Sequence, residues 1–260
     1  MKLQADIYQE QNLTEVVITV PAAFTIAQKN ATLKAAKLAG WKYVKLLPEP
    51  IAAAFAYFVD RPISSKSVVV LFDLGGGTLD VCVFKVRGQF LEIISENGDN
   101  SLGGRDFDNK LMEYFIKVIE NEYGIKNLGN KKYKLMLECQ NIKHNLSVRH
   151  EDHLDDFGPD ECDPISITRQ EFEKMSKDLL TNIQNVIDIA VKNSGYKAKQ
   201  INKVLQVGGG SRMPMVKNLL KDLFPKADHC CAEHPDEVVA IGAAYYAYSL
   251  KSKNANCSVI

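Results

Sequence analysis

Two aspartates on either side of a glycine-rich loop are the residues best suited to chemistry in this sequence. Asp73 and Asp80 flank a loop made of Gly75, Gly76, Gly77 and Thr78. Because glycine has no Cβ, its backbone N–H groups can approach a phosphate closely, and a carboxylate beside a phosphate suits a hydrated Mg²⁺. Apolar residues at 68–72 and 81–84 predict two buried strands joined by this loop. A lone run of three glycines is more typical of a tight hairpin, so the phosphate site needs support from the rest of the chain.

A third carboxylate, Glu49, lies between Pro48 and Pro50, where a short strand at 43–47 is expected to give way to a helix at 51–57. The two prolines restrict the backbone on both sides of it. A carboxylate held in this way suits a general base or a group that positions water. An isolated glutamate is also commonly a solvated acid in a turn, and the sequence leaves both interpretations open.

Gly208, Gly209 and Gly210 form a second glycine run, directly after a strand pattern at 204–207 and before Arg212. Pro214 then suits the first turn of a helix. A strand, a glycine loop and a helix N-terminus together favour an anion or nucleotide site, since free N–H groups and the positive end of the helix point the same way. Arg212 adds a planar cation that can stack on a purine. The alternative is close packing of helix on strand, which also requires glycine.

Hydrophobic periodicity and capping signals predict the remaining elements. Strands are expected at 16–20, 90–95 and 165–167, and helices at 31–39, 106–123, 131–146, 168–193 and from 235–237 onward. Thr25 with Gln28, and Thr168 with Glu171, have the spacing of capping boxes. Residues 97–104 are expected to form a polar loop and 151–163 a solvated acidic connection, with His150 and His153 exposed.

The composition is that of a globular protein with no strong charge bias. The chain has 260 residues, 46% of them hydrophobic and 25% charged, and a formal net charge of zero. This length suits one large or two ordinary domains, and zero net charge gives no reason to expect nucleic acid or an acidic membrane as a partner. Residues 1–10 lack the apolar core of a signal peptide, and the longest apolar run, 51–59, is too short to span a bilayer.

Six cysteines occur without CxxC or framework spacing, which favours reduced thiols in a cytoplasmic or nuclear protein. Cys230 and Cys231 lie near two histidines, but adjacent cysteines chelate one ion poorly, and we expect no metal there. Residues 257–260, Cys-Ser-Val-Ile, match the C-a-a-X prenylation pattern. A membrane is therefore expected as a partner only if Cys257 is prenylated.

Six motifs occur in the order and at the spacing seen in the seventy-kilodalton heat-shock chaperones. They are TVPAAF (19–24), PEPIAAAFAY (48–57), FDLGGGTLDV (72–81), LGGRDFD (102–108), VGGGSRMP (207–214) and HPDEVVAIGAA (234–244). Over residues 1–250 the chain resembles the ATPase domain of that family. The resemblance implies an α/β, actin-like (ribonuclease H-like) ATPase fold, in which two lobes close on a nucleotide.

The resemblance also implies roles for individual residues. Asp73 and Asp80 would act through Mg²⁺ and its waters, Glu49 would lie near the γ-phosphate, and residues 75–78 would contact phosphates. The remaining nucleotide-binding residues would be Gly104, Gln140, Lys143, His144, Ser147, Gly208, Gly209, Gly210, Arg212 and Asp236. His144 stands where the family usually has arginine, which makes it a poorer stacking cation. The implied cofactors are ATP or ADP with Mg²⁺, and the implied partners are nucleotide-exchange factors and J-domain co-chaperones.

The departures from the family pattern concern catalysis. The family's first phosphate loop, D-L-G-T-T, and the catalytic lysine that follows it do not occur here. We therefore expect an incomplete first lobe at 1–62 and a complete second lobe. The base of that lobe is expected at 63–102 and 179–250, its upper subdomain at 103–178, and a tail at 251–260. Strand 16–20 is expected to keep an apolar edge.

Hydrolysis depends on positioning, so the expected activity of this chain is weak nucleotide binding with slow or absent ATP hydrolysis. Two alternatives stay open. One is a non-enzymatic interaction module that binds co-chaperones or exchange factors. The other is a truncated or pseudogene product.

Overall fold

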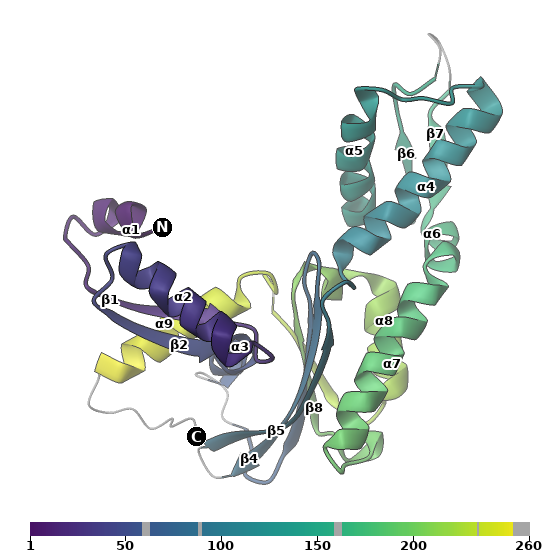
Figure 1. Cartoon of the computed structure of the whole chain (residues 1–260). Coiled ribbons are helices and arrows are strands. Elements are labelled where there is room, and N and C mark those ends of the chain that lie inside the picture. The colour runs from purple at the N-terminus through teal and green to yellow at the C-terminus, as the bar shows by residue number, and fades with distance from the viewer. Residues whose placement is uncertain (59–62, 88–89, 159–162, 233, 252–260) are drawn as a thin grey trace.

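The structure is a computed structural model that describes residues 1–58, 63–87, 90–158, 163–232 and 234–251. Figure 1 shows a small N-terminal α/β part, a central sheet with helices on both faces, and a tall upper part that rises from one end of the sheet. The expected α/β class is confirmed. No helix in the described ranges is long and apolar enough to cross a membrane.

The central sheet has five strands in the order β5-β4-β3-β8-β9. They are β3 (Val68–Leu74), β4 (Leu79–Arg87), β5 (Phe90–Asp99), β8 (Lys203–Val207) and β9 (Asp228–Cys231). The strands β3, β4 and β5 pair antiparallel, whereas β8 runs parallel to both β3 and β9. The glycine hairpin predicted at 68–84 is confirmed. β5 extends further than expected and takes up part of the predicted loop at 97–104.

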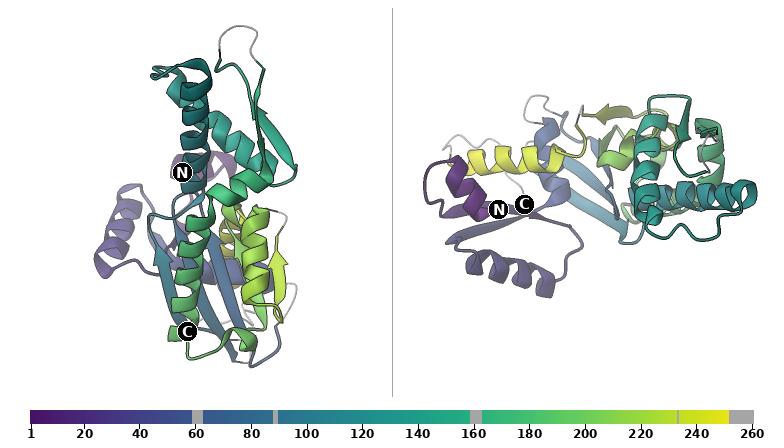
Figure 2. Two further views of the ribbon diagram at one scale, coloured as in Figure 1. Left: turned by 90° about the vertical axis from the view of Figure 1, so that its right-hand side faces the viewer. Right: turned by 90° about the horizontal axis from the view of Figure 1, so that it is seen from above.

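Alternation along β3 gives the sheet two apolar faces. Val70, Phe72 and Leu74 belong to one buried cluster, and Val69 and Leu71 belong to another. The first cluster is covered by α7 (Lys177–Asn193) and α8 (Pro214–Leu223), and the second by α3 (Glu49–Phe58) and α9 (Val238–Lys251). By the same alternation Asp73 lies on the α3 side of the sheet. Figure 2 shows these helices on opposite sides of the strands.

The crossing of α3 and α9 is very close. A Cβ placed on Gly242 of α9 would lie 1.6 Å from the carbonyl oxygen of Ala52 in α3. Phe55 of α3 also packs edge-on against Tyr246 of α9, with ring centroids 5.2 Å apart. The small residues predicted for the final helix therefore serve this crossing, which fixes α3 against α9.

The N-terminal part consists of α1 (Lys2–Tyr8), β1 (Glu15–Val20), α2 (Ile26–Leu38) and β2 (Tyr43–Pro48). The capping box at Thr25 and Gln28 is confirmed, and α1 was not predicted. β1 pairs in parallel with β2 alone among the described strands. An apolar groove of about 780 Å³ runs beside β1 between α2 and α9, which agrees with the expected apolar edge.

The upper part contains α4 (Gly104–Tyr123), α5 (Lys131–Leu146), β6 (Glu151–Leu154), β7 (Ile165–Thr168) and α6 (Arg169–Met175). Residues 151–154 pair antiparallel with β7, so the prediction of a solvated connection over the whole of 151–163 was wrong at its start. Residues 159–162 lie outside the described residues. His150 and His153 are exposed as expected.

Two further predictions need correction. The single helix expected at 168–193 is divided into α6 and α7 at Ser176, whose φ of −94° and ψ of 6° are not helical. Residues 228–231, considered only for metal binding, form the edge strand β9. Within the described ranges, no three His, Cys, Asp or Glu side chains are grouped to hold a metal ion directly. Cys257 and the rest of 252–260 lie outside the described residues.

Candidate nucleotide site

Three carboxylates converge on the α3 side of the sheet. Asp73 and Asp80 are direct partners across the β3–β4 ladder, and Glu49 is the first residue of α3. Burial, and after it the neighbouring Asp80 and Glu49, raises the pKa of Asp73 from its ordinary value of 3.8 to about 7. Burial and Asp80 raise the pKa of Glu49, and burial and Glu96 raise that of Asp80. Without a cation nearby, the three carboxyls therefore resist ionisation.

This donor set fits a hydrated Mg²⁺. In the described part of the chain, none of the groups that shift these three pKa values is basic. A divalent cation would supply the missing positive charge, and hard cations prefer carboxylate and water oxygens. Because the carboxylates are not grouped for direct chelation, Asp73 and Asp80 would hold the ion through its waters.

The first glycine loop is fastened to the start of α4. The amide of Gly75 donates to the carbonyl of Thr78 at 3.0 Å, and the amides of Gly104 and Arg105 donate to the carbonyls of Gly75 and Gly76 at 2.9 Å. A Cβ on Gly76 or Gly77 would meet nothing within 4 Å, so the loop is open on that side, whereas Gly103 packs closely against the backbone of Gly77 on another side. This is the geometry that a phosphate needs for close approach.

The second glycine loop contains both packing and open positions. Gly208 has a φ of +79°, and a Cβ there would lie 2.3 Å from the carbonyl oxygen of Leu74 and 2.6 Å from a carboxylate oxygen of Asp73. A Cβ on Gly210 would lie 2.6 Å from the side chain of Leu74. A Cβ on Gly209 would meet nothing within 4 Å. The packing alternative thus explains Gly208 and Gly210, whereas Gly209 is open to a ligand.

Helix α5 forms the opposite wall through a buried ion pair. The ammonium of Lys143 lies 2.7 Å from a carboxylate oxygen of Asp108 and donates to the carbonyl of Gly104 at 3.0 Å. Lys143 and Asp108 are only 7% and 9% exposed, so each charge depends on the other. This pair fixes α5 against the start of α4, next to the first glycine loop.

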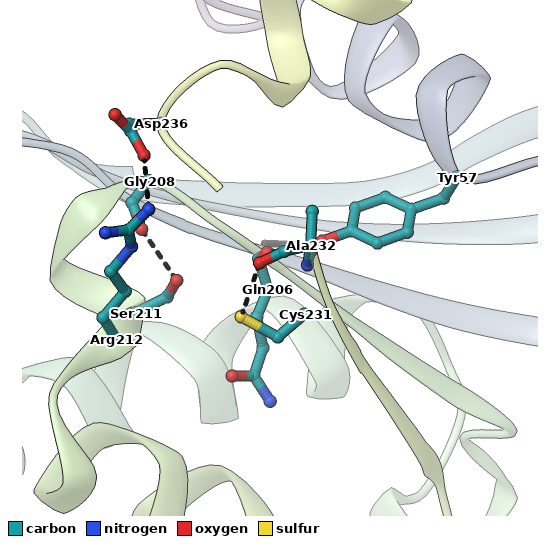
Figure 3. Close-up of polar contacts among 8 residues, drawn as sticks. All are labelled: Tyr57, Gln206, Gly208, Ser211, Arg212, Cys231, Ala232 and Asp236. Atoms are coloured by element: carbon teal, nitrogen blue, oxygen red, sulfur yellow. Dashed lines mark hydrogen bonds and ion pairs between the residues drawn. The ribbon is translucent and has the colours of Figure 1, made fainter. Parts of the chain in front are cut away.

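A pocket of about 710 Å³ lies between these elements. Its walls include eleven of the residues predicted to bind nucleotide: Gly75, Gly76, Gly104, Gln140, Lys143, His144, Ser147, Gly209, Gly210, Arg212 and Asp236. Two of these lining residues, Arg212 and Asp236, form an ion pair at 3.1 Å (Figure 3). Partial burial, then Lys143, lowers the pKa of His144 from 6.5, which disfavours its cation.

Six predicted residues do not line the pocket: Glu49, Asp73, Gly77, Thr78, Asp80 and Gly208. They belong to the carboxylate cluster and to the two glycine loops that lead to it. Sequence reasoning did not assign roles to Asp108, Lys217 or Ala232, which line the pocket. For Asp108 a signal existed, since it lies four residues after Gly104 on a helix and so on the same face. Lys217 and Ala232 carry no such signal.

Comparison with known proteins agrees with this geometry. A family model described as Hsp70 protein matches residues 1–259. The heat shock 70 kDa protein BIP3 of Oryza sativa subsp. japonica is 37% identical over 254 residues, which cover 95% of this chain and 38% of the rice protein. The chain thus spans well under half the length of this relative. The fold is the actin-like ATPase fold expected for such a match, and the chain belongs to the Hsp70 family.

Proposed function

We propose that this chain binds ADP or ATP with Mg²⁺ in the pocket between α5 and the second glycine loop. The observation that carries the proposal is the convergence of three segments on one pocket: the hairpin loop at 75–76, helix α5, and the loop at 209–212. A volume of about 710 Å³ accommodates a nucleotide. In this proposal the phosphates lie beside the first glycine loop, which joins the two strands that carry Asp73 and Asp80.

The residues of the chain have distinct tasks in this proposal. The backbone at Gly76 and Gly209 lies open to phosphate oxygens, and Lys143 is a fixed positive charge beside them. Arg212 offers its planar guanidinium to the base, with Asp236 holding it in place. Mg²⁺, when bound, neutralises phosphate charge. Glu49, Asp73 and Asp80 orient its waters from the α3 side.

Hydrolysis is expected to be slow for these 260 residues. Glu49 can orient an attacking water, but the described cluster offers it no basic partner that would stabilise the transferred phosphoryl group. A single-turnover assay with the purified chain and Mg-ATP would measure this directly. Release of phosphate at the rate of a complete Hsp70 ATPase domain would refute the expectation.

Thermal unfolding with Mg-ADP, Mg-ATP and Mg-GTP tests nucleotide binding. A ligand at a hundredfold excess over its Kd should stabilise the chain by about 2.7 kcal/mol. Gly209→Val is the informative variant, because its side chain points into open space and fills the pocket without a clash in the fold. We expect unchanged stability without ligand and no shift with nucleotide. Equal shifts in the wild type and the variant would place the nucleotide elsewhere.

A second candidate function, capture of an exchange factor or co-chaperone, is supported by the upper half of α5. Tyr133, Met136 and Leu137 are 67%, 41% and 42% exposed, at helical spacing. Met136 continues the line of Gln140 and His144, so a partner bound there would act on the wall of the pocket. A pull-down with an Hsp70 nucleotide-exchange factor tests this. Capture should survive Gly209→Val and fail in a Tyr133→Ser, Met136→Ser double variant.

A further inference from the structure

One tyrosine outside the predicted site contacts the ends of two strands that lead into the pocket. Tyr57 lies in the last turn of α3, eight residues after Glu49. Its hydroxyl donates to the carbonyl of Gln206 at 2.8 Å and accepts from the amide of Ala232 at 2.9 Å. Figure 3 shows the ring reaching from α3 to the ends of β8 and β9. A single hydroxyl therefore contacts segments 149 and 175 residues away in the chain.

Both partners of this hydroxyl lead directly into the pocket. Gln206 is the last residue of β8 that pairs with β9, opposite Cys231, and it lies two residues before Gly208. Ala232 follows that pair and itself lines the pocket, four residues before Asp236. The hydroxyl thus lies where the two strands end and the loops that carry Gly209 and Asp236 begin.

The other end of α3 carries the carboxylate side of the site. Glu49 begins this helix, and the close crossing at Gly242 and Ala52 holds the helix body against α9. The helix α3 therefore holds Glu49 at its start and Tyr57 in its last turn at a fixed separation. Burial, before any neighbouring group, raises the pKa of Tyr57 to about 12, so its proton is present throughout the physiological range.

We propose that the Tyr57 hydroxyl is a positioning group that sets the distance between the carboxylates and the loops of the nucleotide pocket. The inference rests on the proposed nucleotide binding at that pocket. Nucleotide held by the loops at 209 and 236 is correctly placed for Mg²⁺ on the carboxylates only while this contact is made. Loss of the hydroxyl should therefore weaken binding mainly when Mg²⁺ is present.

The test is Tyr57→Phe, which keeps the ring and removes the hydroxyl. The matched control is Tyr248→Phe on α9, whose side chain is 74% exposed. Affinity for ADP is measured by calorimetry in Mg²⁺ and in EDTA. We expect Tyr57→Phe to weaken Mg-ADP binding by about 5- to 30-fold, the range for one or two lost buried hydrogen bonds, and ADP binding in EDTA by less than about twofold. Equal losses in both buffers would overturn the proposal, as would no loss.

A double-mutant cycle with Glu49→Gln strengthens the test. If Tyr57 acts through the carboxylate side, its loss should cost much less when Glu49 is already neutral. Additive losses would indicate two independent contributions and contradict the proposed linkage.

Hydrogen exchange of the ligand-free proteins separates this inference from the proposed function. Tyr57→Phe should accelerate amide exchange at 207–212 and 234–238 and leave 242–248 of α9 unchanged. If the wild type binds no nucleotide, the proposed function fails, and the exchange result still decides the positioning role. Unchanged exchange in both loops would refute that role.

Discussion

Substitution of Asp73 by asparagine should have opposite effects on the protein with and without its ligand. Asp73 titrates near pH 7 in the folded chain because it is buried beside Asp80 and Glu49, and near 3.8 otherwise. A raised pKa means that the folded state binds the proton more tightly than the unfolded state. The contribution of protonated Asp73 to the free energy of unfolding is therefore fully present below pH 3.8 and is lost as the pH rises through about 7. At pH 8 the ionised carboxylate opposes folding.

The size of this effect follows from the shift in pKa. The difference between about 7 and 3.8, at about 1.36 kcal/mol per unit, corresponds to about 4 kcal/mol as an upper limit. Relaxation and entry of water lower it, so we expect Asp73→Asn to stabilise the metal-free chain by about 2 to 4 kcal/mol at pH 8. At pH 5 less than half of that gain should remain, because the folded chain still keeps the proton on Asp73 and the cost comes only from ionisation of this carboxyl in the unfolded chain.

Urea unfolding in EDTA at pH 8 and pH 5 measures this gain, with Asp222→Asn on the exposed side of α8 as the matched control. The same titration at pH 8 with Mg-ADP at a thousandfold excess over its Kd should reverse the order, since the wild type then gains about 4.1 kcal/mol of ligand-linked stability and Asp73→Asn gains little. A metal-free Asp73→Asn protein less stable than the wild type at pH 8 would refute the electrostatic reasoning. A gain of equal size at both pH values would refute the assigned pKa.

Three further predictions concern packing and the α5 wall. Gly242→Ala should destabilise the chain by about 3 kcal/mol or more, because its Cβ would overlap the carbonyl of Ala52. Urea unfolding measures this cost, and a value below about 1 kcal/mol would contradict the close crossing. Arg169→Ala should speed amide hydrogen exchange at the end of α5. The guanidinium of Arg169 donates to the carbonyls of Leu146 and Arg149 at 2.7 and 2.6 Å. Unchanged exchange would refute this anchor. His144 should titrate below 6.5 by NMR in the ligand-free chain, since burial and Lys143 disfavour its cation; a higher midpoint would contradict this environment.

Local signals in the sequence were sufficient for much of the fold. The capping boxes at Thr25 and Thr168 mark the starts of α2 and α6, because each threonine accepts from the amide three residues later. The glycine hairpin after Val68 and the strand before Gly208 were also predictable, since their apolar runs are bounded by glycine. These features depend on neighbours in the chain, which a single sequence contains.

Features that depend on distant residues were missed. β9 has a polar and cysteine-rich sequence with no strand pattern, and it forms because β8 offers a free edge to pair with. β6 reads as an acidic connection, and it becomes a strand because Leu154 is buried opposite Ile165. Helix α7 starts after the buried Ser176, whose backbone leaves the helical region although the apolar pattern of the sequence continues. Tertiary context decided each of these cases.

The glycines show why the sequence could locate the candidate site but could not say which glycine packs against the fold and which is open to a ligand. Gly208 and Gly209 are neighbours of identical type, yet a side chain on Gly208 would collide with Leu74 and Asp73, whereas one on Gly209 would meet nothing. The packing explanation therefore holds for Gly208, whereas Gly209 stays open for the proposed ligand. The packing of Gly208 also affects the carboxylate cluster. The carboxylate of Asp73 can lie against Gly208 only because glycine has no Cβ. A side chain at Gly208 would thus move a carboxylate of the proposed Mg²⁺ site, although Gly208 itself does not line the pocket.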